Sequence, residues 1–263
     1  MKYTNIDEIN KPLSRFVYGT TSASFEGDEP KAFDSLDAAW EAGFRVFDTA
    51  HSYGEAERVL GKWLEKRGCR EETVILDKGL NPGQKGFDDV YSADTIREQF
   101  KMSLDRLQTD HVEMYILHRD DPTKPVDEIV EVLNELKADG KIIRFGGSNW
   151  TMKRTKEANA YAEKHGLIPF SVCSPSYSLA KLENDPWGGS VTLTGDDNKP
   201  FRDWLTQNQM PVFNYSALAR GYLSGKYHSD DSIPIEACLG SGTIAEYKSE
   251  ENRLRLGRIE KLA

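Results

Sequence analysis

The chain has 263 residues, with 43 acidic and 34 basic side chains and a formal net charge of −9 at pH 7. This length is ordinary for one large domain, and the acidic balance argues against nucleic acid and against an anionic membrane surface as partners. No apolar run is long enough to cross a bilayer and the first residues lack a secretory signal, so we expect a cytoplasmic protein with one domain over residues 1–263.

Short runs of β-forming residues alternate with longer segments of helical period from Arg15 onward. The first strands are expected at residues 16–19, 44–48 and 73–76, and each is followed by apolar residues at helical spacing. This order predicts parallel strands that are joined by right-handed helical crossovers.

The same alternation continues toward the end of the chain. Further strands are expected at residues 112–117, 142–148, 170–174 and 211–216, and a last helical stretch at residues 252–263. The pattern therefore predicts an α/β fold, a parallel barrel with about seven β/α units. Because no eighth strand follows, we expect the barrel domain to be truncated at its C-terminus.

Two unusually long segments, residues 179–200 and 221–251, each follow a predicted strand. Loops that follow the strands of a parallel barrel collect at its C-terminal mouth, where binding loops are common. We therefore expect both segments to be loops that act as lids over a bound molecule.

Four reactive side chains follow or end predicted strands: Asp48, Tyr53, Lys78 and His118. In a parallel barrel these strand ends meet at one mouth, where such folds carry out their chemistry. A nearby ammonium group lowers the pKa of a phenol, which makes Tyr53 a proton donor at neutral pH. Asp48 would balance the charge of Lys78, and His118 would orient a substrate oxygen. The set predicts proton transfer coupled to attack at a carbonyl group.

Each of these residues also has a purely structural interpretation. Asp48 alone can cap a loop, Tyr53 can be a half-buried aromatic, and His118 can be a polar group at the barrel rim. Lys78 is harder to explain in this way because it ends an apolar strand. We predict no metal site, since Asp48 and His51 lack a third ligand and the three cysteines form no CxxC pair.

The sequence Phe-Asp-Thr-Ala-His-Ser-Tyr-Gly at residues 47–54, with Glu57 after it, resembles the signature opening of the aldo-keto reductases. The resemblance continues through residues 104–118, 140–149 and 215–226, in the order of that family. It implies a TIM (β/α)8-type barrel that binds NADPH across its mouth and reduces an aldehyde or ketone by hydride transfer. Such an enzyme has a small-molecule carbonyl substrate as its partner.

The resemblance also implies roles for single residues. Tyr53 matches the general acid, Lys78 and Asp48 match the pair that tunes it, and His118 matches the residue that orients the substrate carbonyl. The remaining matches are cofactor-binding positions, which also include Asp48. They are Gly19, Thr20, Ser148, Asn149, Ser174, Tyr215, Ser216, Leu218, Arg220 and Lys226.

Several of these positions have alternative interpretations. Ser148 and Asn149 can be a strand end with a helix cap, Arg220 can form a surface ion pair, and Lys226 can be a solvated lysine after a turn. Ser174 stands where the family usually has glutamine, and a hydroxyl cannot offer the donor and acceptor of an amide. The last strand and its helix, which bind the adenosine 2′-phosphate in relatives, are not expected in this sequence. The choice between NADPH and NADH is therefore not decided.

These observations leave three hypotheses. The first is a carbonyl reductase with Tyr53 as its general acid. The second is an aldo-keto-reductase-like protein that binds a cofactor or regulates a partner with little turnover, which the open barrel and Ser174 favour. The third is a truncated chain that folds only with a partner chain that supplies the missing edge.

Overall fold

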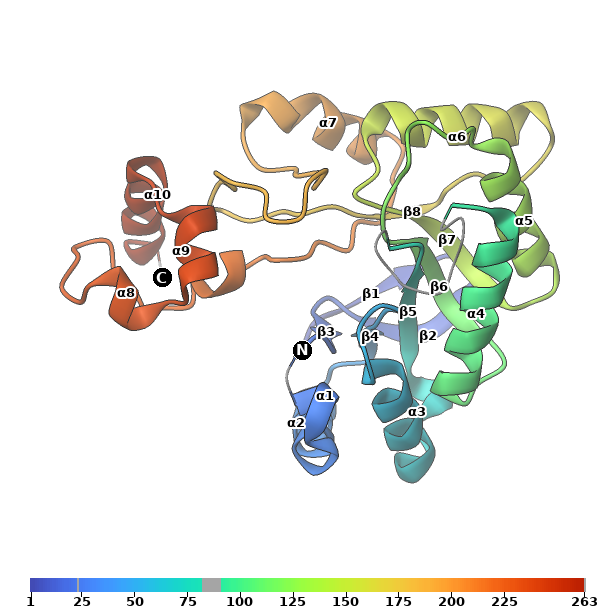
Figure 1. Cartoon of the computed structure of the whole chain (residues 1–263), viewed down its shortest axis with the longest axis horizontal. Coiled ribbons are helices and arrows are strands. Elements are labelled where there is room, and N and C mark those ends of the chain that lie inside the picture. The colour runs from blue at the N-terminus through green and yellow to red at the C-terminus, as the bar shows by residue number, and fades with distance from the viewer. Residues whose placement is uncertain (23, 82–90, 263) are drawn as a thin grey trace. The chain divides into compact units, whose positions relative to one another are not determined.

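A computed structural model describes residues 1–22, 24–81 and 91–262 of the chain (Figure 1). The chain divides into two compact units, Met1–Cys173 and Ser174–Ala263, and each is described by itself. The expected single domain over residues 1–263 stays a prediction. Ala263, the last residue of the predicted final helix, lies outside the described residues.

A curled parallel sheet forms the centre of the first unit (Figure 1). Its six strands are hydrogen-bonded in sequence order, which confirms the predicted parallel α/β fold of barrel type with incomplete units. They are β3 (Val17–Gly19), β4 (Val46–Asp48), β5 (Val74–Gly79), β6 (Val112–Leu117), β7 (Ile142–Ser148) and β8 (Val172–Ser174).

Helices alternate with these strands, as the apolar spacing predicts. They are α1 (Ser24–Gly27), α2 (Glu29–Glu41), α3 (Ala56–Arg67), α4 (Ala93–Leu107), α5 (Asp127–Ala138) and α6 (Met152–Lys164). Side-chain caps fix several helix starts: the Ser92 hydroxyl accepts from the Thr95 amide ahead of α4, and the Thr151 hydroxyl accepts from the Arg154 amide ahead of α6. The apolar helix faces bury the outer side of the sheet, where Trp63 and Phe100 are almost fully covered.

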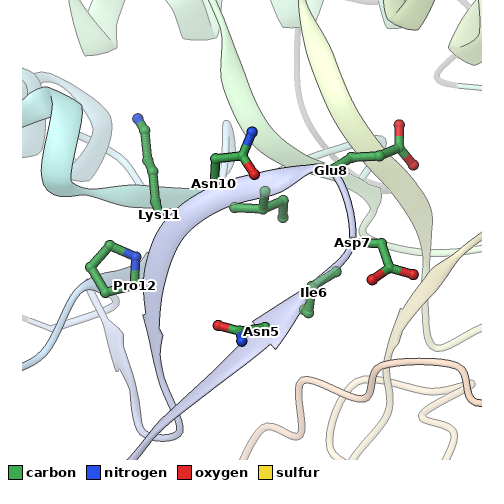
Figure 2. A pocket seen from close by; sticks show the side chains of 8 residues that line it. Asn5, Ile6, Asp7, Glu8, Asn10, Lys11 and Pro12 are labelled. Atoms are coloured by element: carbon green, nitrogen blue, oxygen red, sulfur yellow. The ribbon is translucent and has the colours of Figure 1, made fainter.

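The sequence analysis missed an antiparallel hairpin before the first parallel strand. It consists of β1 (Tyr3–Ile6) and β2 (Ile9–Ser14). Figure 2 shows the pocket that its residues 5–12 line, with Asp7 and Glu8 at the turn. None of the predicted site residues lines this pocket.

The hairpin is tied to the sheet by a buried carboxylate, Glu113 of β6. Its oxygens accept hydrogen bonds from Lys11 at 2.7 Å, from Arg70 at 2.9 Å and from the Ile75 amide at 2.7 Å. Burial alone would raise the pKa of Glu113, but His111, Arg70 and Lys11 lower it to about 2. The carboxylate is therefore ionised in the folded protein at neutral pH.

Replacing Glu113 with glutamine is expected to lower the free energy of unfolding by about 3–5 kcal/mol at neutral pH, because two partly buried cations lose the fully buried carboxylate that balances their charge. Because the pKa of Glu113 is lowered, its charge stabilises the fold at any pH above the ordinary carboxyl pKa of 4.5. This stabilisation is lost as the pH falls toward about 2. Denaturant unfolding at neutral pH and near pH 2 should therefore show a deficit only at neutral pH. Glu98→Gln on the exposed side of α4 is the control, and an equal deficit at both pH values would contradict this account.

The second unit is mainly helical, and one strand prediction fails there. Residues 211–216 form no strand in the described chain: Val212 and Tyr215 are isolated bridge residues, and the bridge of Tyr215 is with Ser176. A strand needs a continuous partner, and this segment is paired only at separated residues. The helices of this unit are α7 (Lys199–Gln207), α8 (Ile235–Cys238), α9 (Ser241–Tyr247) and α10 (Glu250–Glu260).

The segment at 221–251 is not the open loop that its length predicts, because it contains α8 and α9. Tyr222, Tyr227, Ile235 and Tyr247 from this segment join a small apolar core of the second unit. A role of either long segment as a lid stays a prediction. In the part of the chain that the structure describes, no helix has the length and apolar character that a membrane span requires.

Candidate active site

Three neighbouring strands bring the predicted reactive side chains to one edge of the sheet. Asp48 is the last residue of β4, Lys78 lies near the end of β5, and His118 directly follows β6. Tyr53 lies in the turn between β4 and α3, where its amide donates to the Ala50 carbonyl at 2.9 Å. The parallel register of β4, β5 and β6 therefore brings Asp48, Tyr53, Lys78 and His118 together.

Lys78 is buried and pairs with Asp48. Its Nζ donates to Asp48 Oδ1 at 2.6 Å and to the Thr49 carbonyl at 2.6 Å. Burial has the largest single effect and favours the neutral amine, but the Asp48 carboxylate and the other acidic neighbours together raise the pKa of Lys78 above its usual value. The ammonium group thus stays charged and is held in a fixed position.

Tyr53 lies against both Lys78 and His118. The Lys78 Nζ is 4.8 Å from the centroid of the Tyr53 ring, and the Tyr53 and His118 rings meet edge to face with centroids 5.5 Å apart. Lys78 lowers the pKa of Tyr53, as the sequence analysis expects, but burial has the larger effect and the net pKa is raised. The phenol is therefore protonated at neutral pH and can donate its proton.

His118 is neutral, and two residues that the sequence analysis did not single out orient it. Burial, Lys78 and Arg119 lower the pKa of His118 to about 3. Its Nδ1 lies 3.4 Å from the Ser52 Oγ, which accepts a hydrogen bond from the Asn81 amide nitrogen at 3.1 Å. Since the Ser52 oxygen accepts from Asn81, its hydroxyl can donate to Nδ1, which leaves the proton of His118 on Nε2.

Two predicted cofactor residues lie beside His118 at the end of β7. Ser148 and Asn149 are buried, and the Asn149 amide donates to the His118 carbonyl at 3.3 Å and to the Ser148 Oγ at 3.2 Å. Asn149 has a φ of 60°, an uncommon backbone conformation that often occurs at functional sites. Ser148 and Asn149 therefore belong to the same edge of the sheet as the four reactive groups.

Gly19 and Thr20 lie beside Asp48 at the end of β3. Gly19 is in register with Asp48, and both the amide and the hydroxyl of Thr20 donate to the Asp48 carbonyl at 3.0 Å. A methyl group added at Gly19 would meet no atom within 4 Å in the described structure, so there is open space beside this strand end.

The other predicted cofactor residues belong to the second unit. Ser174 is buried at the end of β8, whereas Leu218 and Lys226 are exposed. Tyr215 takes part in the isolated bridge with Ser176, and Ser216 has a φ of 54°. The structure therefore describes these residues within their own unit only.

Arg220 forms a salt bridge with Glu246, a nearly fully buried carboxylate of α9. Its guanidinium also lies over the Trp187 ring, 5.4 Å from the centroid. This is the ion pair that the sequence analysis gave as the alternative to phosphate contact. Among the described residues no cluster of three His, Cys, Asp or Glu side chains fits a metal ion.

Comparisons with known proteins point to one family. A family model described as "Aldo/keto reductase family" matches residues 15–246. The chain is 34% identical over 242 residues to the uncharacterized oxidoreductase YrpG of Bacillus subtilis, covering 86% of this chain and 69% of that protein. It is 31% identical over 210 residues to the aldo-keto reductase str7 of Strobilurus tenacellus, covering 79% of this chain and 56% of that protein. It is 29% identical over 262 residues to a probable voltage-gated potassium channel subunit beta of Oryza sativa, covering 96% of this chain and 74% of that protein.

Proposed function

The chain belongs to the aldo-keto reductase family, and from this premise we propose that it reduces an aldehyde or ketone to an alcohol with a nicotinamide cofactor. The observation that supports this best is the arrangement of Lys78, which is paired with Asp48 and packed against the Tyr53 ring. A buried phenol beside a fixed ammonium group is suited to protonate an oxygen on which negative charge develops.

The residues at this edge of the sheet fit a nicotinamide cofactor. The Ser148 hydroxyl and the Asn149 amide are the kinds of donor and acceptor that hold a carboxamide group. Gly19 is in register with Asp48, and an added methyl group there would meet no described atom within 4 Å, so this strand end is open beside the reactive groups. A bound nicotinamide cofactor, NADPH or NADH, would supply the hydride.

In this proposal Tyr53 gives its proton to the substrate oxygen as negative charge develops there. The Lys78 ammonium stabilises the phenolate that remains, and Asp48 keeps that ammonium in place. The neutral His118 donates from Nε2 to the same substrate oxygen and so fixes its position.

The proposal is tested by cofactor consumption. We expect the purified chain to oxidise NADPH or NADH when an aldehyde or ketone from a mixed panel is added, and to show no such oxidation without a carbonyl compound. Absorbance of the reduced cofactor measures this directly. If the cofactor binds but no carbonyl compound on the panel causes its oxidation, this proposal fails.

A second candidate is a cofactor-binding or regulatory protein with little turnover. The similarity to proteins named potassium channel subunit beta favours it, as do Ser174 in place of glutamine and the pairing of Arg220 with Glu246. Intrinsic fluorescence would show cofactor binding, and binding without carbonyl-dependent oxidation is the result that this candidate requires.

Replacing Ser52 with alanine is expected to lower kcat/KM about tenfold, because His118 loses the neutral hydrogen bond that fixes its tautomer. Steady-state kinetics of the variant would measure this loss. Ser35→Ala is the matched control, because the Ser35 hydroxyl donates to the Ala32 carbonyl within α2 and to no other described residue. A Ser52→Ala enzyme as active as the control would rule out this role of Ser52.

A further inference from the structure

Two fully buried carboxyl groups lie behind Lys78, on the opposite side of the sheet from the reactive groups. Asp77 precedes Lys78 in β5, and successive residues of a strand point to opposite faces. Lys78 reaches Asp48, whereas Asp77 contacts Glu57 of α3. Asp77 and Glu57 both have 0% exposure, so water cannot solvate either carboxyl group.

The hydrogen bonds around this pair leave three carboxyl oxygens without a donor. One oxygen of Glu57 accepts from Arg106 at 2.9 Å. The other oxygen of Glu57 and both oxygens of Asp77 have no hydrogen-bond partner among the residues that the structure describes, although the Lys78 amide lowers the pKa of Asp77. Ionised carboxylates can only accept, and a buried acceptor that is left unpaired is costly. A hydrogen bond between Asp77 and Glu57 is one of the effects that raise the pKa of Asp77, and a single proton shared between the two carboxyl groups pairs two of these three oxygens.

The charges around Asp77 and Glu57 also favour one proton shared by these two carboxyl groups. Arg106 is the cation bound to Glu57, and Lys78 is engaged by Asp48 and the Thr49 carbonyl. Burial lowers the pKa of His51, which lies beside Arg106 and is therefore neutral at neutral pH. Tyr115, in register with Asp77 on β6, is fully buried and its pKa is raised well above the ordinary value, so it is neutral too.

One proton on the pair gives a neutral group made of Arg106, Glu57 and Asp77. Two ionised carboxylates would instead leave an excess negative charge in a site with no exposure. Burial first, and then the Glu57 charge, raise the pKa of Asp77 well above its usual value, in agreement with this count.

We propose that Asp77 is a neutral carboxylic acid that donates a hydrogen bond to Glu57 and so leaves Asp48 as the carboxylate that is paired with Lys78. The role assigned to Lys78 rests on the proposed function. With Asp77 neutral, Asp48 is the carboxylate that directs the ammonium group toward Tyr53. An ionised Asp77 would add a negative charge next to Lys78 in the chain, which would raise the pKa of Tyr53 and weaken it as an acid.

Infrared spectroscopy of the purified full chain tests the protonation state without substrate. We expect the carbonyl stretch of a protonated carboxylic acid at neutral pH, and its loss in Asp77→Asn. Asp34→Asn, at an exposed position of α2, is the matched control and should keep the band. The absence of the band from the unmodified chain would overturn the proposal, whatever the variants do.

A second measurement uses Tyr53 to test whether Asp77 carries a negative charge near Lys78. The pKa of Tyr53 is read from the difference between the ultraviolet titrations of two chains that differ only by Tyr53→Phe. This difference is measured for the unmodified chain and again for chains that carry Asp77→Asn or Glu57→Gln. Asp77→Asn replaces one neutral group with another, so we expect the Tyr53 pKa to stay unchanged. Glu57→Gln leaves Arg106 without its carboxylate and removes the Glu57 charge that raises the pKa of Asp77. Asp77 should therefore ionise, lose its infrared band and raise the Tyr53 pKa by about one unit or more.

One result of the titration would contradict a neutral Asp77. If Asp77 were ionised in the unmodified chain, Asp77→Asn would remove a negative charge near Lys78 and shift the Tyr53 titration to lower pH. Neither the infrared band nor the phenol titration needs turnover. A chain that reduces no carbonyl compound but shows the expected band and shifts would therefore refute the proposed function and leave the state of Asp77 established.

Discussion

Replacing Tyr53 with phenylalanine is expected to lower kcat for carbonyl reduction about 10²–10⁴-fold, which is the usual contribution of a positioned general acid. The change removes only a hydroxyl group, and the ring keeps its contacts with Lys78 and His118. Cofactor binding should therefore be retained while proton transfer is lost. Steady-state kinetics with fluorescence titration of the cofactor would separate the two effects.

The matched control is Tyr18→Phe, because Tyr18 is a partly buried tyrosine of β3 whose ring packs against Phe44 and Phe47. It should reduce carbonyl compounds as fast as the unmodified chain. Equal rates for the Tyr53 and Tyr18 variants would eliminate Tyr53 as the proton donor. The raised pKa adds a pH test: since only the protonated phenol can donate, activity should fall at a pH above the ordinary tyrosine value of 10.0.

The central fold could be predicted because hydrophobic period and strand order determine it. The strands β6 and β7 have the bounds that their apolar runs predict, and every parallel neighbour follows in sequence order. Once the strands are parallel and in order, the residues at their C-terminal ends must share one edge. Asp48, Lys78 and His118 could therefore be placed together from the sequence alone.

Other features depend on tertiary contacts that a linear pattern does not contain. The hairpin of β1 and β2 has a weak alternation, and its links to the sheet include the ion pair between Lys11 and Glu113, which are far apart in sequence. Residues 211–216 have the composition of a strand, but strand formation depends on a continuous partner, and this segment forms only isolated bridges in the described chain.

The candidate site was predicted less completely than the fold for the same reason. Ser52 and Asn81 are ordinary polar residues in sequence. Only the structure shows that Asn81 donates to Ser52 and that Ser52 lies against His118. Asp77 carried a signal that could have been used, because an acidic residue inside an apolar strand needs a partner or a proton. That partner, Glu57, was visible only as part of a family signature.

The second large effect is expected for Lys78→Met, which should lower kcat about 10²–10³-fold by removing a fixed positive charge beside the reacting oxygen. Loss of the ammonium should also raise the pKa of Tyr53 further, by about 1–3 units, because the cation at present opposes the effect of burial. The ultraviolet titration of Tyr53 in the variant measures this shift directly, and stopped-flow reduction of an aldehyde measures the rate.

Stability can be separated from chemistry in this variant because Lys78 has a specific counter-charge. Lys78→Met leaves the Asp48 carboxylate without its partner, whereas adding Asp48→Asn removes that charge. We therefore expect the double variant to unfold at a higher denaturant concentration than Lys78→Met but to be no faster as a reductase. Lys62→Met, which breaks an exposed pair with Glu29 on the surface, is the control for loss of a lysine. If the double variant recovered activity together with stability, the rate loss in Lys78→Met would be a folding effect and the role of the ammonium group in catalysis would be refuted.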